Sequence, residues 1–229
     1  MRTIDVDGVT HELVSDGSGA ARPGVILFPT VMGITDLERG FAARLVERGY
    51  AVLLADLYGR RFTPDQRDAA FAAMDALRGD RAALRDRLLA VLGVAIEQDE
   101  IDDERIAAIG FCFGGQNALD LARSGVEIGG VASFHGLFDP PGLPPQPIAA
   151  KVSAYHGWDD PLVPPEAMVA LANELTAAGA DWRINAFGNV GHGFTNPGAT
   201  GAMPGIKFDQ TTATRAWAAC DYFLAECLA

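Results

Sequence analysis

The run IGFCFGG, residues 109–115, constrains the fold of this chain more than any other segment. It has the form Gly-x-nucleophile-x-Gly, with cysteine in the place that serine usually occupies. An apolar stretch, 105–109, precedes the run, and a helix-like stretch, 116–123, follows it. The pattern predicts a strand, a very tight turn and a helix, with Cys112 at the apex of the turn.

Such a turn requires a strained backbone at Cys112 and very small residues two positions to either side, here Gly110 and Gly114. A cysteine at the apex faces the substrate from a helix N-terminus, whose partial positive charge favours the thiolate. The alternative interpretation of the motif alone is a small cysteine buried between two packing glycines.

Apolar stretches alternate with amphipathic ones along most of the chain. After an expected N-terminal hairpin (3–6 and 10–14), the expected strands are 25–28, 51–55, 105–109, 130–134, 152–155 and 182–186. The expected helices are 36–48, 65–77, 81–96, 114–123, 165–178 and 210–227, with Asp36 as the cap of the first. This alternation predicts an α/β fold: a mostly parallel central sheet with helices on both faces and ligand sites at the carboxyl ends of its strands.

Length and composition narrow the class of protein. The 229 residues fit a single domain, 1–229, and no apolar run approaches the ~18 residues that span a membrane. The N-terminus lacks an apolar leader segment, and the three cysteines have no zinc-like spacing, so we expect a cytoplasmic protein with free thiols. The net charge of −12 disfavours nucleic acid and anionic membranes as partners.

A nucleophilic thiol needs a base and a group that orients the base. His192 lies between two glycines in a loop just after the last expected strand, where core packing explains it poorly. The orienting carboxylate is expected just after strand 152–155, where Asp159 and Asp160 compete. We favour Asp160, because it immediately precedes the Pro-x-Val-Pro segment. The order Cys112, Asp160, His192 is that of the α/β-hydrolase fold.

The other histidines are weaker candidates. His156 ends a strand and is expected to be structural, His135 could equally line the pocket or be structural, and His11 is expected at the surface. In the same geometry, two backbone N–H groups form the oxyanion hole. One belongs to Phe113, directly after the nucleophile. The other comes from the loop after strand 25–28, where we choose Val31 and leave its two neighbours, 30 and 32, open.

The chain resembles the dienelactone hydrolase family. The matching segments are 110–115 (GFCFGG), 56–59 (DLYG), 160–164 (DPLVP) and 191–194 (GHGF), and they span most of the chain. The resemblance implies a compact α/β-hydrolase domain without a large cap. It also implies opening of an enol-lactone ring by water, the type reaction of the family in the degradation of chloroaromatic compounds.

Two positions depart from the family pattern. Thr30 stands where the family typically carries a glutamate that helps to deprotonate the cysteine. Type members also hold the substrate carboxylate with two arginines. One corresponds to Arg67, but Asn196 stands where the second would lie. An uncharged ester is therefore as compatible with this chain as the type substrate.

These features predict a hydrolase of carboxylic esters or lactones that uses a Cys-His-Asp triad through a thioester, without a metal or an organic cofactor. An apolar pocket wall is expected from Met32, Phe71 and Phe194, although core packing also explains each of them. Two alternatives stay open: a general small-ester carboxylesterase or thioesterase, and a non-catalytic binding or redox-sensing protein. The expected partner is a small ester or lactone, and the chain is expected to be a monomer or a small homo-oligomer.

Overall fold

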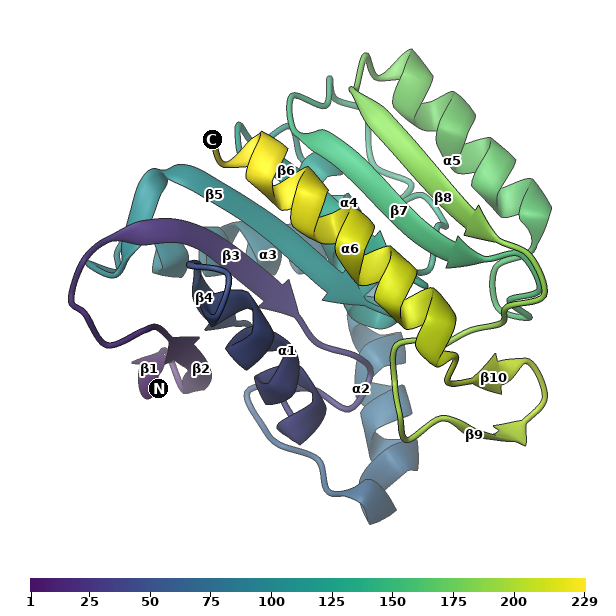
Figure 1. The fold of residues 1–229 in the computed structure, drawn as a ribbon, viewed down its shortest axis with the longest axis horizontal. Coiled ribbons are helices and arrows are strands. Elements are labelled where there is room, and N and C mark those ends of the chain that lie inside the picture. The colour runs from purple at the N-terminus through teal and green to yellow at the C-terminus, as the bar shows by residue number, and fades with distance from the viewer.

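The computed structural model describes all residues, 1–229, and has an eight-stranded sheet at its centre (Figure 1). The strand order is β1-β2-β4-β3-β5-β6-β7-β8. The strands are β1 (Arg2–Val6), β2 (Val9–Val14), β3 (Arg22–Phe28), β4 (Ala51–Leu54), β5 (Ile101–Phe111), β6 (Gly130–Phe134), β7 (Lys151–Gly157) and β8 (Trp182–Phe187). All pairs from β4 to β8 are parallel, whereas β1 and β2 add to one edge in antiparallel fashion. The expected mostly parallel sheet is confirmed.

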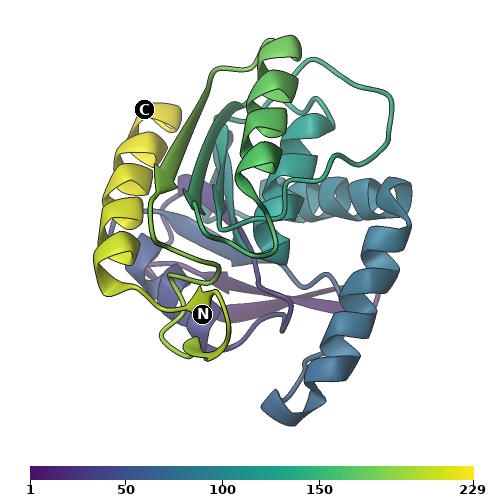
Figure 2. The same ribbon diagram turned by 90° about the vertical axis from the view of Figure 1, so that its right-hand side faces the viewer.

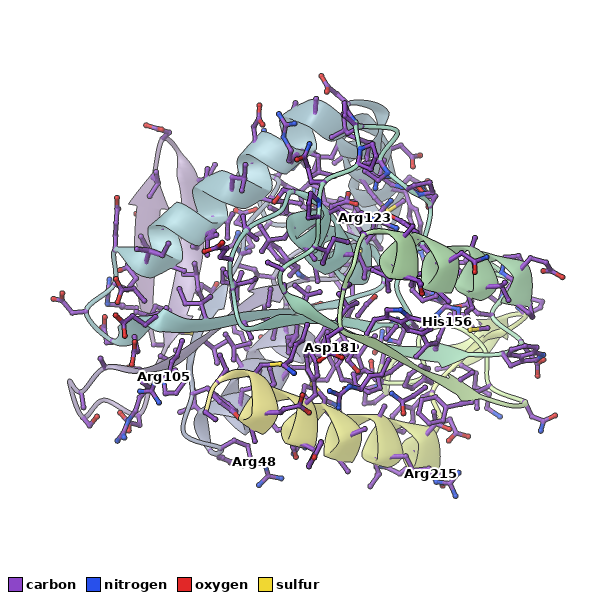
Figure 3. All side chains as sticks on the ribbon, turned by 90° about the horizontal axis from the view of Figure 1, so that it is seen from above. Arg48, Arg105, Arg123, His156, Asp181 and Arg215 are labelled. Carbon is purple, nitrogen blue, oxygen red and sulfur yellow. The ribbon has the colours of Figure 1, made fainter.

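Helices cover both faces of the sheet, so the molecule has three layers (Figure 3). The helices are α1 (Asp36–Val46), α2 (Arg67–Gly79), α3 (Arg81–Ile96), α4 (Phe113–Arg123), α5 (Pro165–Ala177) and α6 (Gln210–Cys227), and a short 3-10 turn, Pro64–Gln66, leads into α2. Buried residues of α1 and α6 share one core, and those of α2, α3, α4 and α5 share the other. No large cap domain is inserted between the strands.

Strand β3 shows why the central strands are apolar without interruption. Val25 and Leu27 pack into the core under α1 and α6, whereas Ile26 and Phe28 pack into the core under the opposite helices. All four side chains are fully buried. A strand with two buried faces cannot alternate apolar and polar residues, so its sequence is an apolar run.

Several boundaries differ from the expectations: β5, for example, begins at Ile101 rather than at 105, and β3 begins at Arg22 rather than at 25. One hairpin was not expected. Thr35, not Asp36, caps α1, because the side chain of Glu38 completes a capping box with it. Helix α2 begins at Arg67, after the 3-10 turn. Strands β9 (Thr200–Met203) and β10 (Ile206–Lys207) form a separate hairpin beyond the carboxyl ends of the parallel strands (Figures 1 and 2).

The expectation that His11 lies at the surface is wrong: it is buried, and its Nδ1 accepts a hydrogen bond from the Asp56 N–H at 3.0 Å. The expected hairpin and the expected proline-rich loop are confirmed. The N-terminal hairpin turns at Asp7 and Gly8, both with positive φ. The proline-rich segment 140–147 forms a loop between β6 and β7, seen as the long excursion at the upper right of Figure 2. None of the helices combines the length and the apolar character that crossing a lipid bilayer demands.

Candidate active site

Cys112 occupies a sharp turn between β5 and α4. Its backbone has φ 56° and ψ −117°, outside the regions that side chains favour. A Cβ on Gly110 would lie 1.9 Å from the Gly114 carbonyl oxygen, and a Cβ on Gly114 would lie 2.0 Å from the Phe28 carbonyl oxygen. Only glycine fits at either position, as the motif predicted. The turn leaves the Cys112 side chain half-buried at the carboxyl edge of the sheet.

Asp160 and His192 meet at this same edge. His192 Nδ1 lies 2.8 Å from Asp160 Oδ2, and both residues are buried. The Leu162 N–H donates to the other carboxylate oxygen, Oδ1, at 2.8 Å and fixes the orientation of the carboxylate. Asp159, the competing candidate, is exposed and makes no hydrogen bond with a histidine. Since the imidazole uses Nδ1 to bind Asp160, its Nε2 is the atom available for chemistry.

The β9–β10 hairpin holds the main chain of His192 from both sides. The His192 N–H donates to the Gly205 carbonyl at 2.7 Å, and the Lys207 N–H donates to the His192 carbonyl at 3.1 Å. Gly191 packs so closely on Gly205 that a Cβ would lie 2.0 Å from its carbonyl oxygen. Glycine before His192 is therefore a requirement of this close approach.

The thiol of Cys112 and the imidazole of His192 influence each other strongly. Burial alone raises the pKa of the Cys112 thiol, but attraction to the His192 imidazolium and the Phe113 N–H together lower it below its ordinary value. Burial opposes protonation of His192, yet the Cys112 thiolate and Asp160 raise its pKa to about 10. Nε2 of His192 is buried and makes no hydrogen bond of full geometry in this resting state. Catalytic hydrogen bonds are often poorly aligned before substrate binds and tighten in the substrate complex.

The loop after β3 lies against the start of α4, where Gly114 packs on the Phe28 and Pro29 carbonyls, and each segment offers one candidate backbone N–H for an oxyanion hole. The Val31 N–H makes no hydrogen bond in the protein, whereas the Thr30 carbonyl of the same peptide accepts from the Gly33 N–H at 3.0 Å. The Phe113 N–H is directed at the sulfur of Cys112 at the start of α4. Unoccupied N–H groups near a nucleophile can bind a developing oxyanion.

Two further histidines surround the Asp160–His192 pair. His135 has a left-handed backbone (φ 37°), and its ring lies edge-on to the His192 ring, with centroids 5.0 Å apart. His156 Nε2 lies 3.5 Å from the same Asp160 oxygen that binds His192, and it points from β7 into the layer of α5 (Figure 3). Burial lowers the pKa of both histidines, so both are neutral at pH 7. Neither competes with His192 for a proton.

The candidate substrate-binding residues lie in different settings. Arg67 is exposed at the start of α2, where its guanidinium stacks on Phe71 and its Nη2 lies 3.1 Å from Met203 Sδ in the hairpin. Met32 is half-buried in the loop after β3. Phe194 is fully buried and packs against Phe187 and His135, as core residues do.

The sequence analysis missed one residue of this site, Glu38. It has no exposed surface, and its carboxylate binds the Thr30–Thr35 segment that carries Val31. The signal was present as Thr35-x-x-Glu38, the capping-box pattern.

Comparison with known proteins identifies the family of this chain. The sequence model of the dienelactone hydrolase family matches residues 12–228, nearly the whole chain. The chain belongs to the dienelactone hydrolase family. As a member, it is a hydrolase that acts on carboxylic ester or lactone bonds.

Individual dienelactone hydrolase relatives support the same assignment. The solved structure of a protein designated m3DLH is 38% identical, with a TM-score of 0.90 over 100% of this chain and 98% of its own. A dienelactone hydrolase-like promiscuous phosphotriesterase from metagenomic libraries is 33% identical, with a TM-score of 0.88 over 100% and 98% of the two chains. The carboxymethylenebutenolidase of Rhodococcus opacus is 28% identical over 84% of this chain and 78% of its own length.

Proposed function

We propose that this protein hydrolyses small carboxylic esters and lactones through a thioester formed on Cys112. The observation that carries the proposal is the buried Asp160–His192 hydrogen bond beside a cysteine held in a left-handed turn. A strained backbone and a buried ion pair both cost stability, and they are found together where chemistry requires them.

The reaction begins from a Cys112 thiolate and a His192 imidazolium. The thiolate attacks the carbonyl carbon, and the oxyanion that forms accepts hydrogen bonds from the N–H groups of Val31 and Phe113. The adduct collapses by breaking the bond to the leaving oxygen, which takes a proton from His192 Nε2. Asp160 holds the imidazole in the orientation that these transfers need.

Water completes the cycle. It attacks the thioester carbonyl while neutral His192 takes its proton, and the tetrahedral adduct expels the thiolate of Cys112. The products are the free acid and the restored thiolate–imidazolium pair. Because a thiolate leaves a tetrahedral adduct more readily than an alkoxide does, the enzyme needs a substrate with a good leaving group. Enol lactones and aryl esters meet this need, and amides do not.

The charges around the site favour an uncharged substrate. Arg67 is exposed, forms no ion pair and is the one candidate cation for a substrate carboxylate, while Asn196 stands at the second position. Arg61, also in this region, is already paired with Asp56 at 2.5 Å. A net charge of −12 gives an anionic substrate no long-range attraction. We therefore expect neutral lactones and esters to be hydrolysed at least as well as a dienelactone.

The metagenomic relative supports a second activity at the same site, the hydrolysis of phosphotriesters. The thiolate of Cys112 would attack phosphorus and expel an aryl oxide, leaving an S-phosphorylated cysteine. Water activated by His192 would then break the sulfur–phosphorus bond. The N–H groups that bind a carbonyl oxyanion can bind the phosphoryl oxygen equally.

The test uses purified protein, p-nitrophenyl acetate, a neutral enol lactone, a dienelactone and an aryl dialkyl phosphate. Cys112→Ala should lower kcat for the esters by at least about 10⁴-fold, because the nucleophile is gone. Cys220→Ala is the matched control, since Cys220 is fully buried in α6 and packs in the core that α1 and α6 share. It should retain the parent activity per folded molecule. Acid quenching during turnover should trap one acyl group on Cys112, detected by mass spectrometry of peptides.

Full activity in Cys112→Ala, or acyl label on another residue, would reject the proposal. A protein that turns over none of these substrates, yet forms a stable sulfenic acid at Cys112 with dilute peroxide, would instead support the redox-sensing alternative.

A further inference from the structure

Glu38 is a buried carboxylate without a cation. It lies in the first turn of α1, has no exposed surface and takes part in no ion pair. A buried charge is costly unless hydrogen bonds replace the water that it loses. The neighbouring Arg39 does not supply this compensation, because it is bound to Glu12 and Asp36. Hydrogen bonds from neutral groups must therefore compensate for the burial of the Glu38 carboxylate.

Four donors from one short segment surround this carboxylate. Its Oε1 accepts from the Thr30 N–H at 3.1 Å and from the Thr30 hydroxyl at 2.9 Å. Its Oε2 accepts from the Thr35 N–H at 3.0 Å and from the Thr35 hydroxyl. Each carboxylate oxygen therefore binds one end of segment 30–35. These hydrogen bonds are charge-assisted, and such bonds are stronger than those between neutral groups.

Segment 30–35 carries the Val31 N–H. The Thr30 carbonyl is bound by the Gly33 N–H at 3.0 Å, and the Val31 carbonyl is bound by the Tyr58 hydroxyl at 3.1 Å. Because Glu38 also binds the Thr30 N–H, the backbone polar groups next to the Val31 N–H all have partners: the Thr30 N–H, the Thr30 carbonyl and the Val31 carbonyl. The Val31 N–H has no partner, like those of Met32 and Ile34, but it is the one that follows directly on the anchored Thr30, so the groups bound on either side of it restrict its direction.

We propose that Glu38 is a positioning residue for the oxyanion hole: it holds segment 30–35 so that the Val31 N–H is aimed at the oxygen of the substrate. The inference rests on the proposed function and extends it to a residue that touches no substrate atom. A purely structural role as a helix cap would involve only Thr35. The two bonds to Thr30 lie outside the cap and are the ones that serve the site.

Glu38→Gln separates the two roles. Glutamine also completes a capping box, so its amide oxygen can keep the bond to the Thr35 N–H. Its NH₂ group then faces Thr30, whose hydroxyl can rotate to accept but whose N–H cannot. The Thr30 N–H loses its partner while α1 stays capped. The Val31 peptide is then free to turn.

The experiment compares two reactions of the same thiol in the full-length protein. Pre-steady-state acylation by p-nitrophenyl acetate builds an oxyanion, whereas alkylation by iodoacetamide does not. In Glu38→Gln we expect acylation to be about tenfold to hundredfold slower, part of the loss that follows removal of an oxyanion donor. The alkylation rate should stay within about twofold of the parent, because Cys112 and His192 are untouched.

Glu12→Gln is the matched control. Glu12 is another buried carboxylate of the same region, but it binds Arg39 and Arg61 rather than segment 30–35. In Glu12→Gln, the acylation rate and the alkylation rate should change by the same factor or stay unchanged. Thr30→Val removes one of the four bonds and should slow acylation by about threefold without changing alkylation. This variant also decides the matter if Glu38→Gln does not fold.

The outcomes are distinct. Equal acylation in the parent and in Glu38→Gln, or an equal fall of both rates, would overturn the role of Glu38. Unchanged acylation in Thr30→Val would do the same if the glutamine variant cannot be purified. A parent protein that is alkylated but never acylated would instead reject the proposed function itself.

Discussion

Two of the three buried aspartates of this molecule have opposite surroundings. Asp120 in α4 is 4% exposed, and Asp160 after β7 is 3% exposed. Asp120 is bound by Arg81 Nη2 at 2.7 Å and by Arg123 Nη1 at 3.1 Å. Asp160 is bound by one imidazole nitrogen and one backbone N–H. The first carboxylate has permanent cations as partners, and the second has a partner that gains and loses a proton.

The difference separates a structural network from a reactive one. Arg123 also binds Glu174 in α5, and Arg81 also binds Asp139 after β6, so the cluster joins three helices and a loop. Each of the two guanidinium groups is paired with two carboxylates. At Asp160 the chain of contacts ends instead at an unpartnered Nε2 of His192 beside a strained cysteine. Incomplete pairing, rather than burial, marks the site.

The largest expected effect comes from neutralising each aspartate in turn. Asp160→Asn should lower kcat for p-nitrophenyl acetate by about 10³-fold to 10⁴-fold, because the amide no longer enforces the reactive tautomer of His192. Asp120→Asn should leave kcat per folded molecule unchanged but cost about 3 kcal/mol of unfolding free energy, because two buried guanidinium groups each lose one of their two counter-charges. Urea unfolding and steady-state kinetics measure both quantities. The comparison breaks down if Asp120→Asn abolishes turnover while remaining folded.

A smaller effect concerns the pH dependence of the thiol. The lowered pKa of Cys112 means that its thiolate persists to lower pH than a free thiol, whose pKa is ~8.5. The rate of alkylation by iodoacetamide should therefore reach half its maximum well below pH 8.5. His192→Ala removes the attraction that lowers this pKa and leaves the burial that raises it, so alkylation at pH 7 should fall about tenfold. A midpoint at or above pH 8.5 in the parent would show that the pair does not interact.

The smallest effect concerns the exposed cation near the site. Arg67→Ala should raise KM for a carboxylate-bearing dienelactone by about threefold and leave KM for a neutral lactone unchanged, because an exposed charge in water binds weakly. Parallel KM measurements on the two lactones check this. A large, equal rise for both would mean that Arg67 shapes the pocket through Phe71 rather than through its charge.

The sequence predicted the parts of the site that depend on local patterns. The turn at Cys112 follows from two glycines between an apolar run and a helix, and the positions of Asp160 and His192 follow from where strands end. The choice of Asp160 over Asp159 also agrees with the structure, which leaves Asp159 exposed. Each of these depends on a few neighbouring residues.

The parts that depend on distant contacts could not be predicted. Glu38 looks like an exposed position at the start of a helix, and it is buried because segment 30–35 folds back over it. Strands β9 and β10 are short, and every residue of β9 is exposed. Their sequence therefore lacks the alternation of apolar and polar residues from which a strand is predicted. His135 faces His192 only because the end of β6 lies beside the loop that carries His192.

The backbone of His192, the proposed proton carrier, is hydrogen-bonded to the β9–β10 hairpin, which lies outside the main sheet. That hairpin has few paired residues and little buried surface, and segments of this kind open at a lower free-energy cost than a protein's core. Warming should thus disable turnover while the circular dichroism of the molecule still looks native, and cooling should restore it. The working temperature limit would then be governed by eight residues, 200–207, instead of by the thickness of the hydrophobic interior.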